Sequence, residues 1–82
     1  MFLHVIEVKY LQDYSLFLKF NDGSEGELTL EKNLWGKAFE PLKNKKHFQK
    51  VRLDKEIGTI SWPNGADFAP EFLKNNLDTQ LV

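Results

Sequence analysis

The sequence contains no cysteine, only three prolines and no long uninterrupted apolar run. The lack of cysteine excludes disulfides, thiolate metal sites and cysteine nucleophiles, and it leaves the redox compartment unconstrained. No window approaches the roughly 20 apolar residues that cross a bilayer, so we expect a soluble protein with no membrane partner. The amino terminus shows neither a basic leader nor a small-residue cleavage site, which favours a cytoplasmic location.

The net charge is also small, because the chain has 11 Lys and Arg residues and 12 Asp and Glu residues. Nucleic-acid-binding domains are usually net basic, so this balance argues against duplex binding, although a local patch can still contact phosphates. Apolar residues are plentiful at 41%, with seven Phe among them. The length suits one compact domain over residues 1–82, in which we expect about 78–82 to fray.

Apolar and polar residues alternate over three stretches of the first part of the chain, which predicts strands at residues 4–11, 15–20 and 25–30. A short link at Asp13-Tyr14 joins the first two, giving an antiparallel three-stranded meander. The side chains expected to face inward are Ile6, Val8, Tyr10, Leu16, Leu18, Phe20, Gly26, Leu28 and Leu30.

The length of the loop between the second and third strands can be predicted from the faces to which the flanking side chains point. A two-residue loop, Asp22-Gly23, would place Leu18 opposite Glu27. A three-residue loop at 21–23 instead places Leu16 opposite Leu28, so that apolar residues share a face. We therefore predict the three-residue loop, with Gly23 at positive φ.

The remainder of the chain predicts a short helical segment, a second β-hairpin and a C-terminal helix packed on the sheet, and hence an α+β fold. The helical segment begins near Pro41. The hairpin pairs residues 48–54, which carry Lys50 and Arg52 outward, with 59–62. The helix spans about 70–77.

The most closely specified stretch is residues 58–71. Trp62 is a strand former on the core phase, Pro63 ends the strand, and Asn64-Gly65 tolerates positive φ. A helix start follows, because proline and an acid are favoured in a first turn and Asp67 is placed to cap it. The structural motif comprises Trp62, Pro63, Asn64, Gly65, Asp67, Pro70 and Glu71, together with Asp22 and Gly23 of the hairpin.

These residues resemble the family called domain of unknown function 2442 over nearly the whole chain. The resemblance is carried by Asp13, Tyr14, Leu16, Phe20, Asp22, Gly23, Phe39, Pro41, Leu42, Phe48, Val51, Thr59, Ile60 and residues 62–71. It implies a small, mostly prokaryotic α+β protein with no established enzyme activity. Some relatives add a helix-turn-helix domain, and many are encoded beside another small protein in an arrangement like toxin and antitoxin pairs. Lys74 stands where relatives often have tyrosine.

Candidate catalytic and metal-binding residues each have a simpler interpretation. The only two histidines, His4 and His47, lack spaced acidic partners, so we expect no metal and no cofactor. Asp67 and Glu71 are four residues apart and suit either an acid/base pair or helix capping, and we favour capping. Trp62 suits either ring stacking or core packing, and we favour the core. We expect no catalytic residue and no enzyme.

The charges are distributed unevenly along the chain. A basic segment, residues 43–52, contains no acid, whereas residues 22–31 contain no base. Both runs suit solvated faces, but the basic segment also suits contact with an acidic protein or, head to tail, with a second copy of this chain. The candidate partner-binding residues are Lys43, Lys45, Lys46, Lys50 and Arg52.

These features favour a non-enzymatic interaction or regulatory module, one member of a two-gene pair resembling a toxin and its antitoxin. Its expected partner is a small protein with an acidic surface. A DNA-contacting regulator is the alternative, which salt-sensitive duplex binding would reveal. An enzyme with no recognisable motif is the second alternative, which a pocket of convergent carboxylates with perturbed pKa values would reveal.

Overall fold

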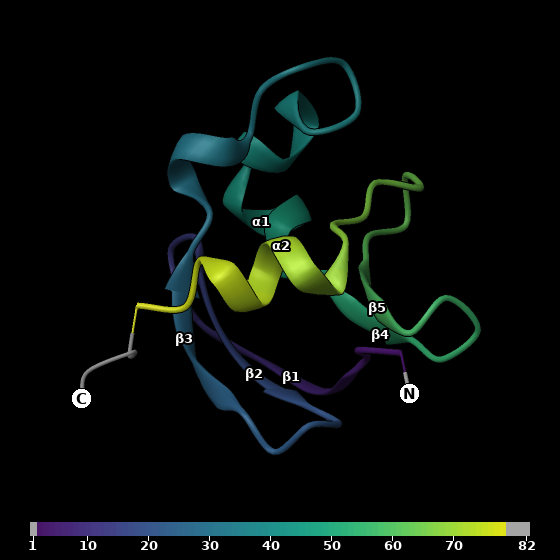
Figure 1. Ribbon diagram of the computed structural model, residues 1–82. Coiled ribbons are helices and arrows are strands. Elements are labelled where there is room, and N and C mark those ends of the chain that lie inside the picture. The colour runs from purple at the N-terminus through teal and green to yellow at the C-terminus, as the bar shows by residue number, and fades with distance from the viewer. Residues whose placement is uncertain (1, 79–82) are drawn as a thin grey trace.

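The fold is α+β, as the sequence predicts, with a three-stranded and a two-stranded antiparallel sheet (Figure 1). The computed structural model describes residues 2–78. The meander of three strands is followed by short helical turns, the second hairpin and the last helix. The elements in chain order are β1 Val5–Gln12, β2 Ser15–Phe20, β3 Glu25–Thr29, the 3-10 turns η1 Glu31–Asn33 and η2 Glu40–Lys43, α1 Lys45–Phe48, β4 Arg52–Asp54, β5 Thr59–Ser61 and α2 Pro70–Asn75.

The β2–β3 hairpin has the predicted register. Leu16 lies opposite Leu28, and the amide N–H of Phe20 donates to the carbonyl of Ser24 at 2.9 Å across a three-residue loop. Gly23 has φ +91°, as predicted. Leu16, Leu18 and Phe20 are all buried, because the three-residue loop sets a strand pairing in which alternate side chains point to the buried face.

The prediction for the first strand is wrong at Ile6. Val5 pairs with Phe20 and Glu7 with Lys19, so Ile6 is an extra residue in β1 with no partner opposite it. Such a bulge shifts the alternation of the strand by one residue. Side chains before the bulge therefore point to the opposite face of the sheet from the one that the alternation after it would predict. Val5 is therefore buried and Ile6 is 55% exposed, while Val8 and Tyr10 keep their inward direction and are half-buried.

The strand predicted over residues 48–54 is also too long. Phe48 ends the one-turn helix α1, and Lys50 lies in the turn that follows, so Lys50 does not alternate with Arg52 on a strand. The cause is Asn44, whose side-chain oxygen accepts hydrogen bonds from the N–H groups of Lys46 and His47. This capping stabilises a helical turn where strand periodicity suggested extension.

The turn after β5 follows the prediction, but the helix cap does not. Gly65 has φ +90°, and its N–H donates to the carbonyl of Trp62 at 2.9 Å. The N-cap of α2 is Ala69, with no capping side chain, so the prediction that Asp67 caps the helix is wrong. Asp67 instead forms a bridge with Ser61 that extends the second hairpin. Pro70 and Glu71 occupy the first turn, as predicted.

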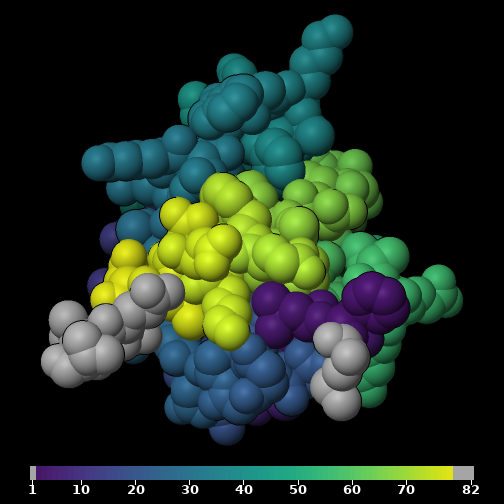
Figure 2. Space-filling view, in the orientation of Figure 1, coloured from purple at the N-terminus to yellow at the C-terminus, as the bar shows by residue number. Residues whose placement is uncertain are grey.

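Helix α2 crosses one face of the meander (Figure 1), and its Leu73 belongs to the same buried core as Leu16 and Phe20. In the space-filling view it separates the N-terminal residues from the segment around η1, η2 and α1 (Figure 2). Leu73 of α2 and Trp62 are fully enclosed, at 0% and 1% exposure, as core packing of Trp62 requires. Thr59 and Ser61 are buried as well, so β5 is covered on both faces.

The described chain remains attached to the sheet as far as Asp78. Leu77 is buried, and the N–H of Asp78 donates to the carbonyl of Glu27 on β3 at 2.6 Å. Fraying is predicted for about 78–82, and at the start of that range the free edge of β3 holds Asp78. The rest of the predicted tail, residues 79–82, lies outside the described residues.

Candidate functional site

The fold places three of the candidate partner-binding residues in two neighbourhoods, whereas Lys46 lies on α1 and Arg52 on β4. Lys43 and Lys45 lie beside Tyr14: the hydroxyl of Tyr14 donates to the carbonyl of Lys43, and the Lys45 ammonium is 5.9 Å from the centre of the Tyr14 ring. Lys45 also pairs with Asp13 at 3.0 Å. That hydrogen bond and the attraction between the two charges raise the pKa of Lys45 above its ordinary value.

The other neighbourhood is a hollow between α1 and the turn after β5. Its floor is formed by Leu42 and Trp62, which are only 2% and 1% exposed. Exposed residues border it, with His47 and Lys50 supplying basic groups. We call this depression, with a volume of about 230 Å³, the Trp62 hollow.

Two prolines and an asparagine complete the walls of the Trp62 hollow. Pro41 belongs to η2 and Pro63 to the turn, so both are rigid at φ. Asn64 bridges two segments: its amide donates to the carbonyl of Ala38 at 2.9 Å, and its side-chain oxygen accepts from the N–H of Ala66 at 3.1 Å. Trp62, Pro63 and Asn64 of the structural motif thereby meet His47 and Lys50 of the basic segment in one depression.

Most cations of the basic segment form no ion pair within the described part of the chain. Lys45 pairs with Asp13, but within residues 2–78 the side chains of Lys43, Lys46, Lys50 and Arg52 form no ion pair. All of these side chains belong to exposed residues. Four of the five candidate partner-binding residues therefore keep their charge available to another molecule.

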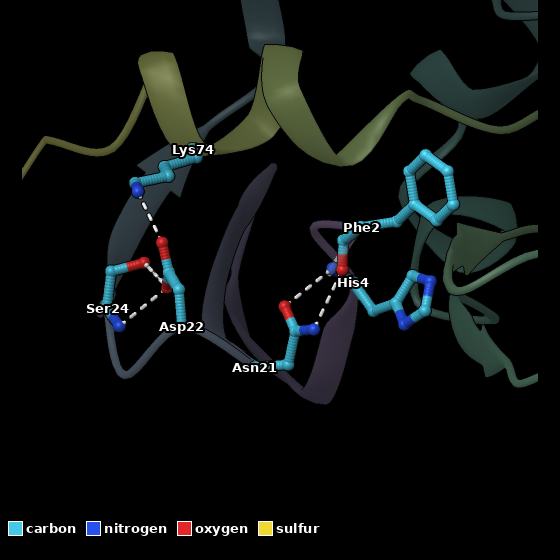
Figure 3. Close-up of polar contacts among 6 residues, drawn as sticks. All are labelled: Phe2, His4, Asn21, Asp22, Ser24 and Lys74. Carbon is cyan, nitrogen blue, oxygen red and sulfur yellow. Dashed lines mark hydrogen bonds and ion pairs between the residues drawn. The ribbon is translucent and has the colours of Figure 1, made fainter.

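The acidic run is partly neutralised. The carboxylate of Asp22 pairs with the Lys74 ammonium of α2 and accepts hydrogen bonds from the N–H and hydroxyl of Ser24 (Figure 3). The Lys74 contact, followed by those from Ser24, holds the pKa of the Asp22 carboxyl well below its usual range. Lys74 thus ties the last helix to the β2–β3 hairpin.

Asn21 is a structural residue that the sequence analysis did not single out. Its side-chain amide donates to the carbonyl of Phe2 and its oxygen accepts from the N–H of His4, each at 2.8 Å (Figure 3). The turn at residues 21–23 thereby holds the first residues of the chain as well as α2. The only signal in the sequence was the preference of asparagine for turns, which does not identify a distant partner.

The two histidines lie in different hollows. His4 borders one with Gly58 and Leu53, whereas His47 borders the Trp62 hollow. Within residues 2–78 no group of three histidines or acids could hold a metal ion. In the same residues no helix has the length and apolar character needed to span a membrane.

A second surface feature without a sequence signal is a row of aromatic rings beside Trp35. Phe39 and Phe72 stack on either side of Phe68, with ring centres 4.5 and 5.2 Å from it. Trp35 borders the same shallow groove and is 72% exposed. The sequence marks Phe39 only through the family resemblance, because its ring partners are distant in sequence.

These features define a small α+β domain with a rigid turn motif, a basic segment and an apolar hollow shared between them. The chain belongs to the family described as Protein of unknown function (DUF2442), whose model matches residues 5–78. No curated protein and no solved structure shows significant similarity to the chain.

Proposed function

We propose that this protein is a non-enzymatic interaction and regulatory module that binds the acidic surface of a small protein partner through its basic segment. The observation that supports the proposal is that, within residues 2–78, Lys43, Lys46, Lys50 and Arg52 form no ion pair while remaining exposed. Cations already paired inside a protein add little to binding, whereas available ones can steer and orient an acidic partner.

The arrangement of the same cations favours a protein partner over duplex DNA. Lys43 and Lys45 lie beside Tyr14 whereas Lys50 borders the Trp62 hollow, and the whole chain has a net charge of −1. Duplex DNA presents a regular row of phosphates, about one charge every 1.7 Å, and rewards a continuous basic face. A folded acidic partner can instead match separate groups of cations.

We further propose a prokaryotic, cytoplasmic setting, with the partner encoded beside this chain as in a toxin and antitoxin pair. Family membership supports this setting through the gene neighbourhood that the resemblance implies. In such a pair the module binds the protein encoded by the adjacent gene and limits that protein's activity. A second copy of this chain is the other partner that the charge distribution would suit.

The direct test is co-expression of the full chain with the product of the adjacent gene, followed by co-purification and calorimetry. We expect a complex whose affinity falls when Lys46, Lys50 and Arg52 are together replaced by Glu. Lys45 is left unchanged, because a Glu there would face Asp13 and disturb the fold. The matched control is Lys55→Glu with Lys37→Glu, which reverses exposed charges outside the basic segment.

Duplex binding by the parent and the triple variant is measured at about 0.15 M salt, where exposed charges act over about 8 Å. Retention of the partner at full affinity by the triple variant, with an unchanged melting curve, would contradict the proposal. Submicromolar duplex binding that the triple variant loses would support the DNA-contacting alternative instead.

A further inference from the structure

We propose that the Trp62 hollow is a specificity pocket that receives one apolar side chain from an acidic segment of a protein partner. His47 and Lys50 at its border then bind carboxylates adjacent to that side chain. The inference rests on the proposed function, since it names the part of the partner that the basic segment recognises. It joins the two strongest features of the sequence, the motif around Trp62 and the basic segment.

The size of the hollow selects a side chain over a larger ligand. Its volume is about 230 Å³. Pockets that bury drug-sized ligands and cofactors usually measure about 300 to 1,000 Å³. A single aliphatic or aromatic side chain needs less space, and its attached backbone remains outside.

The hollow is preformed, which lowers the cost of binding. Trp62 in its floor is held by a hydrogen bond from its Nε1 to the carbonyl of Phe48 at 2.9 Å. Asn64 in its wall is held by its bonds to Ala38 and Ala66. A guest therefore does not have to order the walls, and more of its apolar burial contributes to affinity.

The polar groups at the border select acidic neighbours for the guest. Asn64 makes one hydrogen bond through its amide and one through its side-chain oxygen within the fold, so its orientation is fixed. The side chains of His47 and Lys50 form no hydrogen bond or ion pair within residues 2–78. The basic side chains open to a guest are thus a lysine and an imidazole, and both complement a carboxylate.

The burial of Trp62 argues against a nucleobase as the guest. Single-stranded nucleic acids bind by stacking bases on exposed aromatic faces. Trp62 is 1% exposed and presents no open face, whereas the exposed Trp35 borders a different groove. Apolar contact with a side chain is the interaction that the hollow offers, through the exposed Pro41 and Pro63 in its walls.

The test is an NMR titration of the ¹⁵N-labelled full chain with the peptide acetyl-Asp-Asp-Leu-Glu-Glu-amide. We expect saturable shifts of the Trp62 indole N–H and of the amides of Lys50 and Gly65, while the Trp35 indole N–H serves as an internal reference. Replacing the central Leu by Ala should weaken binding about tenfold, because the apolar contact is lost. Replacing the four acids by Asn and Gln should weaken it similarly.

Two variants test the residues of the hollow itself. His47→Trp places a large ring at the border and should abolish the shifts, and Lys50→Gln should weaken binding about threefold, as expected for an exposed ion pair. Lys55→Gln, outside the hollow, should bind as the parent does. A thermal melt of each variant shows that it remains folded, and Lys50→Gln changes no buried group.

The inference is overturned if the peptide produces no saturable shifts, or if the Ala peptide or the His47→Trp variant binds as strongly as the parent pair. It is also overturned if a single-stranded oligonucleotide, and not the peptide, shifts the Trp62 indole. The proposed function is tested separately by the adjacent gene product. If that product binds the parent and His47→Trp equally, the inference falls and the proposed function remains.

Discussion

The indole Nε1 of Trp62 donates a 2.9 Å hydrogen bond to the backbone carbonyl of Phe48, and the two rings lie with their centres 5.6 Å apart. This pair joins the turn motif to the end of helix α1. Both residues are fully enclosed. The position of His47 and of the turn carrying Lys50 relative to the Trp62 hollow therefore depends on this contact.

Replacement of Trp62 should separate packing from hydrogen bonding. We expect Trp62→Ala to lower the free energy of unfolding by about 3 to 5 kcal/mol, the usual cost of removing a large buried aromatic. Trp62→Phe keeps a ring but removes the indole donor, while the Phe48 carbonyl still accepts from the N–H of Val51 at 3.2 Å. We therefore expect a smaller loss of about 0.5 to 1.5 kcal/mol from the missing hydrogen bond. Denaturant unfolding measures both values.

Trp35 offers the matched control, because it is the same residue type at 72% exposure. Trp35→Ala should change the free energy of unfolding by less than about 0.5 kcal/mol, as most exposed substitutions do. Equal losses at Trp35 and Trp62 would contradict the burial of Trp62.

A second prediction concerns the approach of His4 to Gly58. A Cβ added at Gly58 would lie 2.6 Å from Cδ2 of the His4 ring, and φ there is +70°. Gly58→Ala should therefore cost about 1 to 2 kcal/mol from backbone strain, plus the cost of displacing the ring. Gly65→Ala, with nothing within 4 Å of the added Cβ, reports the backbone cost alone.

The double variant His4→Ala with Gly58→Ala isolates the ring contact. We expect a coupling of at least about 0.5 kcal/mol in the unfolding free energies, because removing the ring relieves the overlap. If the changes in unfolding free energy of the two single variants simply add in the double variant, the exposed His4 ring moves aside without cost.

The third prediction is a pH dependence that originates at Asp22. Its pKa is lowered in the folded state by Lys74 and Ser24, so the unfolded state binds the proton more tightly. The resulting stability is present above the unfolded pKa of about 3.9 and is lost as the pH falls through the lower folded value. Asp22→Asn should be less stable than the parent at pH 7, and the difference should shrink below about pH 4.

Unfolding by denaturant across this pH range provides the measurement. Glu25→Gln is the control, since Glu25 lies on the same hairpin and forms no ion pair within residues 2–78. Its difference from the parent should stay small throughout. A gap between Asp22→Asn and the parent that is constant from pH 7 to pH 2 would refute the role of the Lys74 contact.

The fourth prediction concerns Asn44, which caps α1 through the N–H groups of Lys46 and His47. Asn44→Ala should cost about 0.5 to 2 kcal/mol, and Asn44→Asp should retain the cap. Thermal and denaturant melts compare the two. Equal losses for Ala and Asp would show that the side-chain oxygen of Asn44 does not stabilise α1.

Local patterns predicted the central hairpin correctly. Because side chains alternate with a period of two, a single choice of loop length determined the facing of Leu16, Leu18 and Phe20. The burial of Trp62 and the positive φ of Gly65 also follow from residue type and its immediate neighbours. Such features depend on sterics within a few residues.

Other local patterns were misleading where a distant or competing contact decided the outcome. The bulge at Ile6 depends on how β1 pairs with β2, and the shortened β4 depends on the competing cap at Asn44. Asp67 has the residue type of a cap, but its backbone pairs with Ser61. In each case two conformations suited the same residues and tertiary contacts selected one.

For the candidate site, the sequence by itself determined which residues are basic and which form the rigid turn, because charge and φ preference belong to each residue. Only the tertiary structure decided that His47 and Lys50 border a hollow floored by Trp62, and that Lys45 is paired with Asp13. These relationships join residues 12 to 32 positions apart. Their geometry is set by packing across the whole core, which no local periodicity encodes.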